Sequence, residues 1–231
     1  MKLKKLFPNI NQKKIWDAEN IFYLKSDITR VSKLLYQYEI YKRIIDLPGD
    51  IIECGVFKGA SLVRFLTFRE NLENCYSRKI FGFDAFGNFP KAINDKKSKK
   101  LILPFEKGIS KNELDLLLQE KHFKNFELIK GDVRKTLPNF LKKNSELKVS
   151  LLHLDMDIYE PIKSILITTF PFLNKGAIVI VGILGNPELY GKEVAFNEFL
   201  KTIDKSSISI KKKKFIDNDG KEKEVTYFVK N

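Results

Sequence analysis

Sulfur-containing residues are scarce in this chain of 231 residues, which has two cysteines and two methionines. Cys54 and Cys75 are too few for a disulfide framework, and neither belongs to a C-x-x-C pair of the kind that binds a metal. This composition predicts a protein of a reducing, intracellular compartment.

Long hydrophobic runs are also missing. No apolar stretch approaches the roughly 18 residues that a membrane-spanning helix needs. The basic amino-terminal segment is interrupted by Pro8 and by asparagines, so it does not resemble a signal peptide. We therefore expect a cytoplasmic protein that has no membrane partner.

Positive charge is abundant, with 42 Lys and Arg residues against 29 Asp and Glu residues and a formal net charge of +13. Such a balance fits a polyanionic partner or a small anionic substrate such as a nucleotide-linked sugar. The lysines, including clusters at 96–100 and 211–214, are not interleaved with exposed aromatic residues in a binding stripe. We expect solvated lysines and no nucleic-acid partner, with RNA binding or RNA methylation as the weaker alternative.

A length of 231 residues favours a single domain over residues 1–231, and the hydrophobic periodicity predicts that it is α/β. Apolar residues at helical spacing follow Asp27 and stop at Leu47-Pro48-Gly49, which defines an amino-terminal helical region over residues 1–47. Short apolar segments that alternate with helical or loop segments are predicted as buried strands at 50–55, 80–84, 126–130, 149–154 and 177–181. Strands of this kind suit a parallel sheet with helices on both faces, whose carboxyl ends meet at one edge.

The last part of the chain predicts an antiparallel hairpin. Segments 208–215 and 225–229 flank Asp219-Gly220, a pair that readily takes the positive φ angles of a tight turn. Residues 88–118 are polar, lysine-rich and weakly periodic. We interpret them as an insertion that could close over a site, with an ordinary surface loop as the alternative.

Three predicted strand ends carry glycine or acidic residues. Gly55 and Gly59 let the backbone turn from a strand into a helix whose amino terminus supplies free N–H groups. Asp84 ends the next strand, where an acid commonly accepts hydrogen bonds from ribose hydroxyls, and Gly131-Asp132 follows the third. The chain lacks the G-x-G-x-x-G dinucleotide fingerprint, so adenosine without a diphosphate is the better ligand. Glycine turns without any ligand remain the alternative.

The segment LLHLDMDIYEP delivers two acids, Asp155 and Asp157, separated by one residue. Such a pair can bind a metal, act as a general base, or only order the turn after a strand. His153 alternates with Asp155, and we interpret it as a hydrogen-bonded core residue.

These segments together resemble the macrocin O-methyltransferase (TylF) family of class I S-adenosylmethionine-dependent methyltransferases. The resemblance covers about residues 29–200 and lies, in order, in GDIIECGVFKGAS, IFGFDAFGNFP, GDVRKTLP, LLHLDMDIYEP and LGNPELYGKEVAFNEFL. It implies a Rossmann-like fold with a seven-stranded, mostly parallel sheet, a terminal antiparallel hairpin and helices on both faces. It also implies methylation of a sugar or glycoside hydroxyl, frequent use of Mg²⁺, and an oligomer such as a homodimer packed through the amino-terminal helices.

The resemblance carries roles onto individual positions. It implies that Glu53, Gly55 and Ser61 line the methionine part of S-adenosylmethionine, with Gly59 in the same turn. Asp84 would hold the ribose, Asp132 and Val133 would flank the adenine, and Phe86 could pack on the cofactor. Asp155 matches the metal-binding acid beside the cofactor, and Asp157 matches the acid proposed as the base.

The chain departs from the family pattern at the end of the strand at 177–181. Gly182 and Ile183 stand where such members have an acidic pair, and neither can coordinate through its side chain. Asp155 alone is a weak magnesium site, although Asn186, Glu188 or Glu193 could substitute as ligands. We expect methyl transfer by proximity and proton abstraction without metal. A cofactor-binding homologue with reduced or no activity, serving as a partner subunit, is the alternative.

Overall fold

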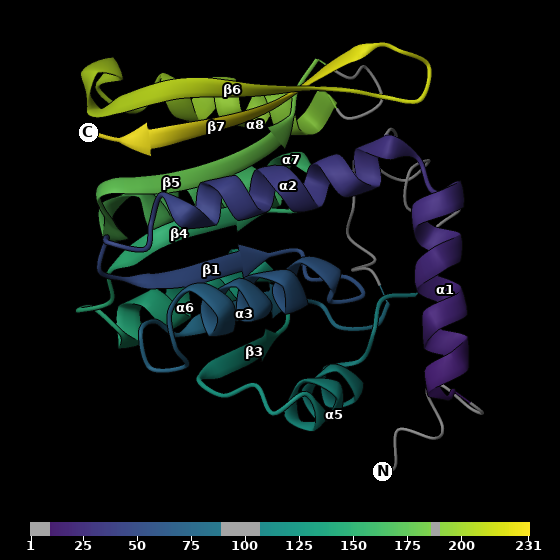
Figure 1. Cartoon of the computed structure of the whole chain (residues 1–231). Helices are drawn as coiled ribbons and strands as arrows, with labels where there is room; N and C mark the ends of the chain where they lie inside the picture. Colours follow the sequence, from purple (N-terminus) through teal and green to yellow (C-terminus); the bar gives the residue numbers. More distant parts are fainter. Residues whose placement is uncertain (1–9, 89–106, 186–189) are drawn as a thin grey trace.

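The computed structural model describes residues 10–88, 107–185 and 190–231. Its centre is a seven-stranded sheet with the strand order β3-β2-β1-β4-β5-β7-β6 (Figure 1). Strands β1 to β5 are parallel, whereas β7 pairs antiparallel with β5 and β6 antiparallel with β7. The predicted parallel sheet with a terminal hairpin is confirmed.

The strands are β1 (Asp50–Cys54), β2 (Ile80–Asp84), β3 (Phe126–Lys130), β4 (Val149–Leu154), β5 (Leu173–Ile183), β6 (Ile208–Ile216) and β7 (Glu222–Lys230). The helices are α1 (Gln12–Lys25), α2 (Ile28–Lys42), α3 (Ala60–Leu72), α5 (Lys111–Glu120), α6 (Val133–Lys143), α7 (Tyr159–Thr169) and α8 (Tyr190–Leu200). None of the described helices is long and apolar enough to cross a membrane.

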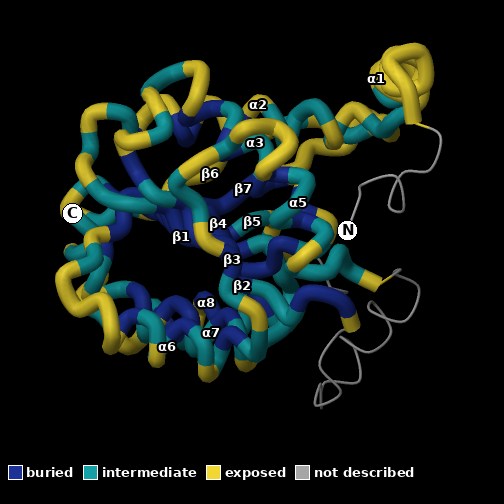
Figure 2. The backbone as a smooth tube through the Cα atoms, turned by 90° about the horizontal axis from the view of Figure 1, so that it is seen from below, coloured by how far each residue is buried: buried dark blue, intermediate teal, exposed yellow. Residues whose placement is uncertain are grey.

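Alternating side chains of the sheet form two cores, one on each face. Ile51 and Leu151 pack with α2, α3 and α5, whereas Ile52 and Leu152 pack with α6, α7 and α8. Figure 2 shows these two helix groups on opposite sides of the sheet. Both faces are therefore covered, which explains why the parallel strands read as continuous apolar runs.

Helix α2 begins where the sequence predicts and ends earlier. The Asp27 carboxylate accepts a hydrogen bond from the Thr29 N–H at 2.8 Å and so caps the helix. The helix ends at Lys42, before the predicted stop at Leu47. The buried guanidinium of Arg78 donates to the carbonyls of Ile44, Ile45, Leu47 and Gly49. A side chain distant in sequence thus holds residues 44–49 and fixes how α2 enters the fold.

The interpretation of residues 88–118 as an insertion is changed at its carboxyl end. Ser110 and Glu113 form a capping box at the start of α5, and Leu114 and Leu118 are buried against the sheet. This end is therefore a packed helix and does not belong to a loop. Residues 89–106 of the predicted insertion lie outside the described residues.

Candidate active site

The site lies where β1 and β4 end side by side, at the point where the strand order of the sheet reverses. The Asp155 N–H donates to the Cys54 carbonyl at 2.9 Å, which ties together the two strand ends. Gly55 has a φ of 93°, and a Cβ there would lie 2.5 Å from the Asp155 carbonyl oxygen. Glycine is required at position 55 because any side chain would separate the strands. Ligands of open α/β sheets bind at this switch point.

Beneath this edge, a buried polar network links four side chains. Arg64 Nη1 donates to the side-chain oxygen Oε1 of Gln37 at 3.1 Å, which turns the side-chain nitrogen Nε2 of Gln37 toward His153 Nε2 at 3.4 Å. His153 Nε2 is therefore the acceptor, and Nδ1–H donates to Glu53 Oε1 at 3.1 Å. His153 is buried and contacts a polar side chain through each ring nitrogen, as predicted for a hydrogen-bonded core residue. Glu53 Oε2 is buried without a hydrogen-bond partner among the described residues.

Asp155, the first acid after β4, is bound on two sides. Lys33 Nζ of α2 lies 2.8 Å from both carboxylate oxygens, and the Ser61 hydroxyl of α3 donates to Oδ2 at 3.2 Å. Burial acts to raise the pKa of Asp155, but the charge and hydrogen bond of Lys33, together with other nearby charges that include Lys192, outweigh burial and hold that pKa well below its usual range. Asp155 is thus an ionised carboxylate whose counter-ion is part of the protein.

Asp157, the second acid, is paired with Lys192 of α8. Lys192 Nζ lies 2.7 Å from Asp157 Oδ1, and the Lys192 side chain is only 6% exposed, whereas that of Asp157 is 41% exposed. The ammonium also lies against β5, because a Cβ at Gly182 would be 2.9 Å from Nζ. The ion pair therefore joins the acid after β4 to the end of β5.

The predicted ribose-binding acid, Asp84, organises two turns. Its carboxylate accepts hydrogen bonds from the N–H of Phe57 at 3.0 Å and of Phe86 at 2.7 Å. Both phenylalanines have positive φ angles, which these hydrogen bonds help to hold. Phe86 is buried. Asp84 therefore fixes the backbone after β1 against the backbone after β2.

The residues predicted to flank the adenine begin helix α6. Asp132 caps the helix by accepting from the Arg134 N–H, and the hydrogen bond from the Arg134 side chain lowers the pKa of Asp132. Val133 is a buried residue of the core with Leu137. Gly131 N–H donates to the Asp84 carbonyl at 2.9 Å, so this turn is joined to the end of β2.

The predicted residues therefore fall into three neighbouring groups along the carboxyl edge of the sheet. The first contains Glu53, Gly55, Ser61 and Asp155; the second contains Asp84, Phe86, Asp132 and Val133; the third contains Asp157. Gly59 is the cap of α3, with a φ of 87° and with Leu114 where its Cβ would lie.

Sequence reasoning missed the two lysines that hold the acids. A signal was present, because Lys192 precedes Ala195, Phe196 and Phe199 at the spacing of a buried helix face. Lys33 likewise lies one turn before the buried residues Tyr36 and Gln37 of α2. A lysine on an apolar stripe needs an acidic partner. Neither sequence position reveals which acid that partner is.

The ligand set does not fit a divalent cation held as the family pattern implies. Glu53, His153 and Asp155 bring ligand atoms within 4.8 Å of one another, but His153 is bound to Glu53 and Asp155 to Lys33. Gly182 and Ile183 offer no side-chain ligand, and Glu193 Oε2 instead accepts from the Gly185 N–H at 3.0 Å. Asn186 and Glu188 lie outside the described residues. We therefore assign no reaction step to a metal.

The strand order, the terminal hairpin and the acids at the switch point define a class I methyltransferase. The sequence model of the macrocin O-methyltransferase (TylF) family matches residues 30–208. The chain therefore belongs to this family, and it is an S-adenosylmethionine-dependent O-methyltransferase.

Solved structures support this assignment. A crystal structure of CalS11, a calicheamicin methyltransferase, is 26% identical over 96% of this chain and 89% of that chain, with a TM-score of 0.69. An apo structure of CalS11, described as a TDP-rhamnose 3'-O-methyltransferase, is 27% identical over 96% of this chain and 90% of that chain, with a TM-score of 0.64. The O-methyltransferase NovP is 18% identical over 86% of this chain and 79% of that chain, with a TM-score of 0.67, and shows the shared fold. No curated protein matches the chain.

Proposed function

We propose that this enzyme methylates a hydroxyl group of a sugar, either free in a nucleotide-linked form or attached to a natural product. The observation that carries the proposal is the pair Asp155 and Asp157, which leaves β4 directly beside the Glu53–Gly55 turn. The similarity to CalS11, whose described acceptor is TDP-rhamnose, supports a sugar as the acceptor class. A nucleotide-linked sugar also suits the net charge of +13.

The first group of residues has the chemistry to hold the methionine part of S-adenosylmethionine. Glu53 Oε2 is buried and has no hydrogen-bond partner in the described part of the chain, so it is a strong acceptor for an ammonium group. Gly55 and Gly59, both with positive φ, let the chain turn from β1 into α3, whose first N–H groups suit a carboxylate. We assign the ribose to Asp84, whose carboxylate is already fixed by two backbone N–H groups. For the adenine, we assign the turn at Asp132; Val133 contributes from the core beneath it.

When bound, S-adenosylmethionine supplies a methyl group on a positively charged sulfur, and the acceptor oxygen forms the new C–O bond as the C–S bond breaks and its electron pair returns to sulfur. We assign Asp157 as the base that takes the hydroxyl proton, because its carboxylate is partly exposed and is held through Oδ1 by Lys192. Asp155, held by Lys33 and Ser61, is assigned to the floor of the site between cofactor and acceptor.

Calorimetric titration of S-adenosylmethionine and S-adenosylhomocysteine tests the cofactor assignment. We then expect S-adenosylhomocysteine to form when TDP-rhamnose or related sugar nucleotides and glycosides are supplied. Binding without turnover on any sugar acceptor would favour a homologue that serves as a partner subunit. The absence of binding would contradict the function itself.

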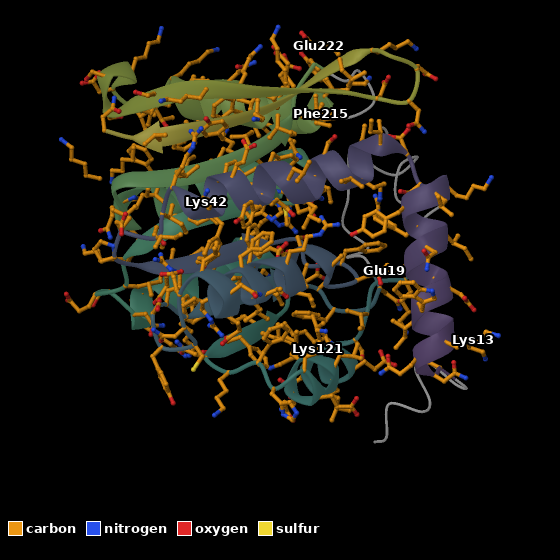
Figure 3. All side chains as sticks on the ribbon, in the orientation of Figure 1. Lys13, Glu19, Lys42, Lys121, Phe215 and Glu222 are labelled. Atoms are coloured by element: carbon orange, nitrogen blue, oxygen red, sulfur yellow. The ribbon has the colours of Figure 1, made fainter. Side chains whose placement is uncertain are left out.

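The placement of the surface lysines bears on whether the enzyme has a nucleic-acid partner. Lys212, Lys213 and Lys214 of the hairpin form ion pairs with Glu224, Glu39 and Glu222. Figure 3 shows other lysines, such as Lys13, Lys42 and Lys121, on separate elements of the molecule. This arrangement supports an enzyme without a nucleic-acid partner. Both cysteines are free thiols, which supports our proposal of a cytoplasmic protein.

A further inference from the structure

The two acids that follow β4, Asp155 and Asp157, are each paired with a lysine from a different side of the sheet. Lys33 comes from α2 and lies 2.8 Å from Asp155, and Lys192 comes from α8 and lies 2.7 Å from Asp157. Helices α2 and α8 pack on opposite faces of the sheet. The two ammonium groups thus converge on the carboxyl end of β4 from both layers of the protein.

The end of β5 is shaped to admit one of these ammonium groups. Gly182 has a φ of 102°, and a Cβ built there would approach Lys192 Nζ to 2.9 Å. The buried Lys192 therefore fills the space beside the position from which an acidic residue would have to reach a metal. Glycine at position 182 thus both removes the acidic side chain and leaves room for the Lys192 ammonium group.

The ammonium groups of Lys33 and Lys192 supply the positive charge that a metal ion would otherwise bring to this site. Two ammonium groups carry the same total charge as one divalent cation, and each of them neutralises one carboxylate, Lys33 that of Asp155 and Lys192 that of Asp157. A magnesium ion near them would be repelled by both ammonium groups, and it would lack the several oxygen ligands that it prefers. Because each ammonium has three N–H donors in a fixed position, it can also face an acceptor oxygen that gains negative charge.

We propose that Lys33 and Lys192 replace the divalent cation in this enzyme, as positioning residues that hold Asp155 and Asp157 and supply the positive charge of the site. Methyl transfer is then independent of metal. This inference rests on the proposed function and concerns the same site.

The first test uses the unmodified protein saturated with S-adenosylhomocysteine. Electron paramagnetic resonance of added Mn²⁺ should show only free metal at concentrations up to about 1 mM, because the two lysines already neutralise the carboxylates. A carboxylate site without these lysines would bind the ion. Initial rates with a sugar acceptor should differ less than twofold between a chelator and Mg²⁺. Stoichiometric Mn²⁺ binding, or a tenfold stimulation by Mg²⁺, would overturn the proposal. Failure to bind S-adenosylhomocysteine would instead count against the proposed function.

The second test removes each charge while keeping the side-chain volume. Lys192→Met and Lys33→Met should each lower kcat roughly 10-fold to 100-fold, with the affinity for S-adenosylhomocysteine unchanged within about twofold, and should shift the pH profile of kcat. Lys79→Met is the matched control, because Lys79 forms an ion pair with Glu127 at 2.7 Å. This pair lies at the amino-terminal ends of β2 and β3, away from the site. If Lys192→Met does not fold, the more exposed Lys33 gives the same measurement. Wild-type kcat in a folded Lys33→Met or Lys192→Met protein would sink the assignment.

Discussion

At the residue scale, Asp157 is the side chain on which the chemistry depends. It leaves β4 two residues beyond Asp155, and its carboxylate is more exposed than the lysine that holds it. A base must reach the proton that it removes, so the partly exposed acid is better placed for this role than Asp155, both of whose oxygens already contact Lys33.

Replacement of Asp157 by asparagine keeps the shape and removes the proton acceptor. We expect kcat to fall by about 10²-fold to 10⁴-fold, the usual contribution of a general base, while binding of S-adenosylhomocysteine is unchanged. Steady-state kinetics and calorimetry give the two quantities. Asp204→Asn is the control, because Asp204 only caps the short turn before β6, near the amino-terminal end of the parallel strands. A fully active Asp157→Asn enzyme would remove Asp157 from the mechanism.

The Asp155–Lys33 pair makes the free energy of unfolding depend on pH. The pKa of Asp155 is lower in the folded protein than the value of about 3.9 expected when unfolded. The pair therefore stabilises the fold above that pH and loses this contribution as the pH falls below it. In Lys33→Met the contribution is absent.

The expected result is a gap in melting temperature between the wild type and Lys33→Met that is largest at pH 7 and closes toward pH 3. For a partly exposed pair worth about 1 kcal/mol, the gap at pH 7 is about 2–4 °C in a chain of this size. Thermal melts at several pH values measure it. A gap that widens in acid would show that the pair does not stabilise the protein through the Asp155 carboxylate.

The sequence predicted where the acids lie but not which side chains hold them, for a physical reason. Carboxyl ends of parallel strands meet at one edge, so the positions of Asp84, Asp155 and Asp157 follow from the strand pattern. Lys33 and Lys192 lie on helices, and the residue that each meets depends on how its helix packs. The resemblance to the family could show the missing acidic pair, but it could not show the ammonium groups.

At the scale of elements, strands β2, β3 and β4 have the bounds predicted from their apolar runs. The bounds of β5 and α2 differ, because tertiary contacts set them. Leu173 of β5 pairs with Val149 of β4, four residues before the predicted start. Arg78 binds the carbonyls of Ile44 and Leu47, which holds the chain after α2 in turns. Neither effect leaves a local signal in the sequence.

The fit between β5 and α8 predicts the outcome of a glycine substitution. In Gly182→Ala, the new Cβ meets the Lys192 ammonium at 2.9 Å and the backbone keeps an unfavourable φ of 102°. We expect a loss of stability of about 1–3 kcal/mol together with a fall in kcat, because the lysine that holds Asp157 must move. Thermal melts and initial rates measure both effects.

Gly220→Ala separates backbone strain from the contact with Lys192. Gly220 also has a positive φ, of 74°, but it lies in the hairpin turn with no heavy atom within 4 Å of its Cβ position. We expect this control to lose some stability and to keep its kcat. Equal kcat values for the two variants would mean that the position of Lys192 does not matter for turnover.

At the scale of the whole molecule, α1 contributes no buried residue to the described fold. Figure 2 shows it set apart from the helices that cover the sheet. Trp16, Tyr23 and Leu24 are 65%, 58% and 78% exposed and recur at helical spacing. An exposed apolar stripe of this kind is costly in water and marks an interaction surface.

We therefore predict a homodimer in which α1 contributes to the interface. Light scattering on the purified protein should give twice the chain mass of 26.9 kDa. The double substitution Trp16→Ser and Leu24→Ser should shift the protein toward monomers, since it removes two large apolar contacts from each copy. Tyr76→Ser, at a tyrosine that is 81% exposed on the loop between α3 and β2, should leave the mass unchanged. A wild-type protein that is monomeric at micromolar concentration would refute the dimer, whereas a dimer insensitive to the α1 substitutions would place the interface on another surface.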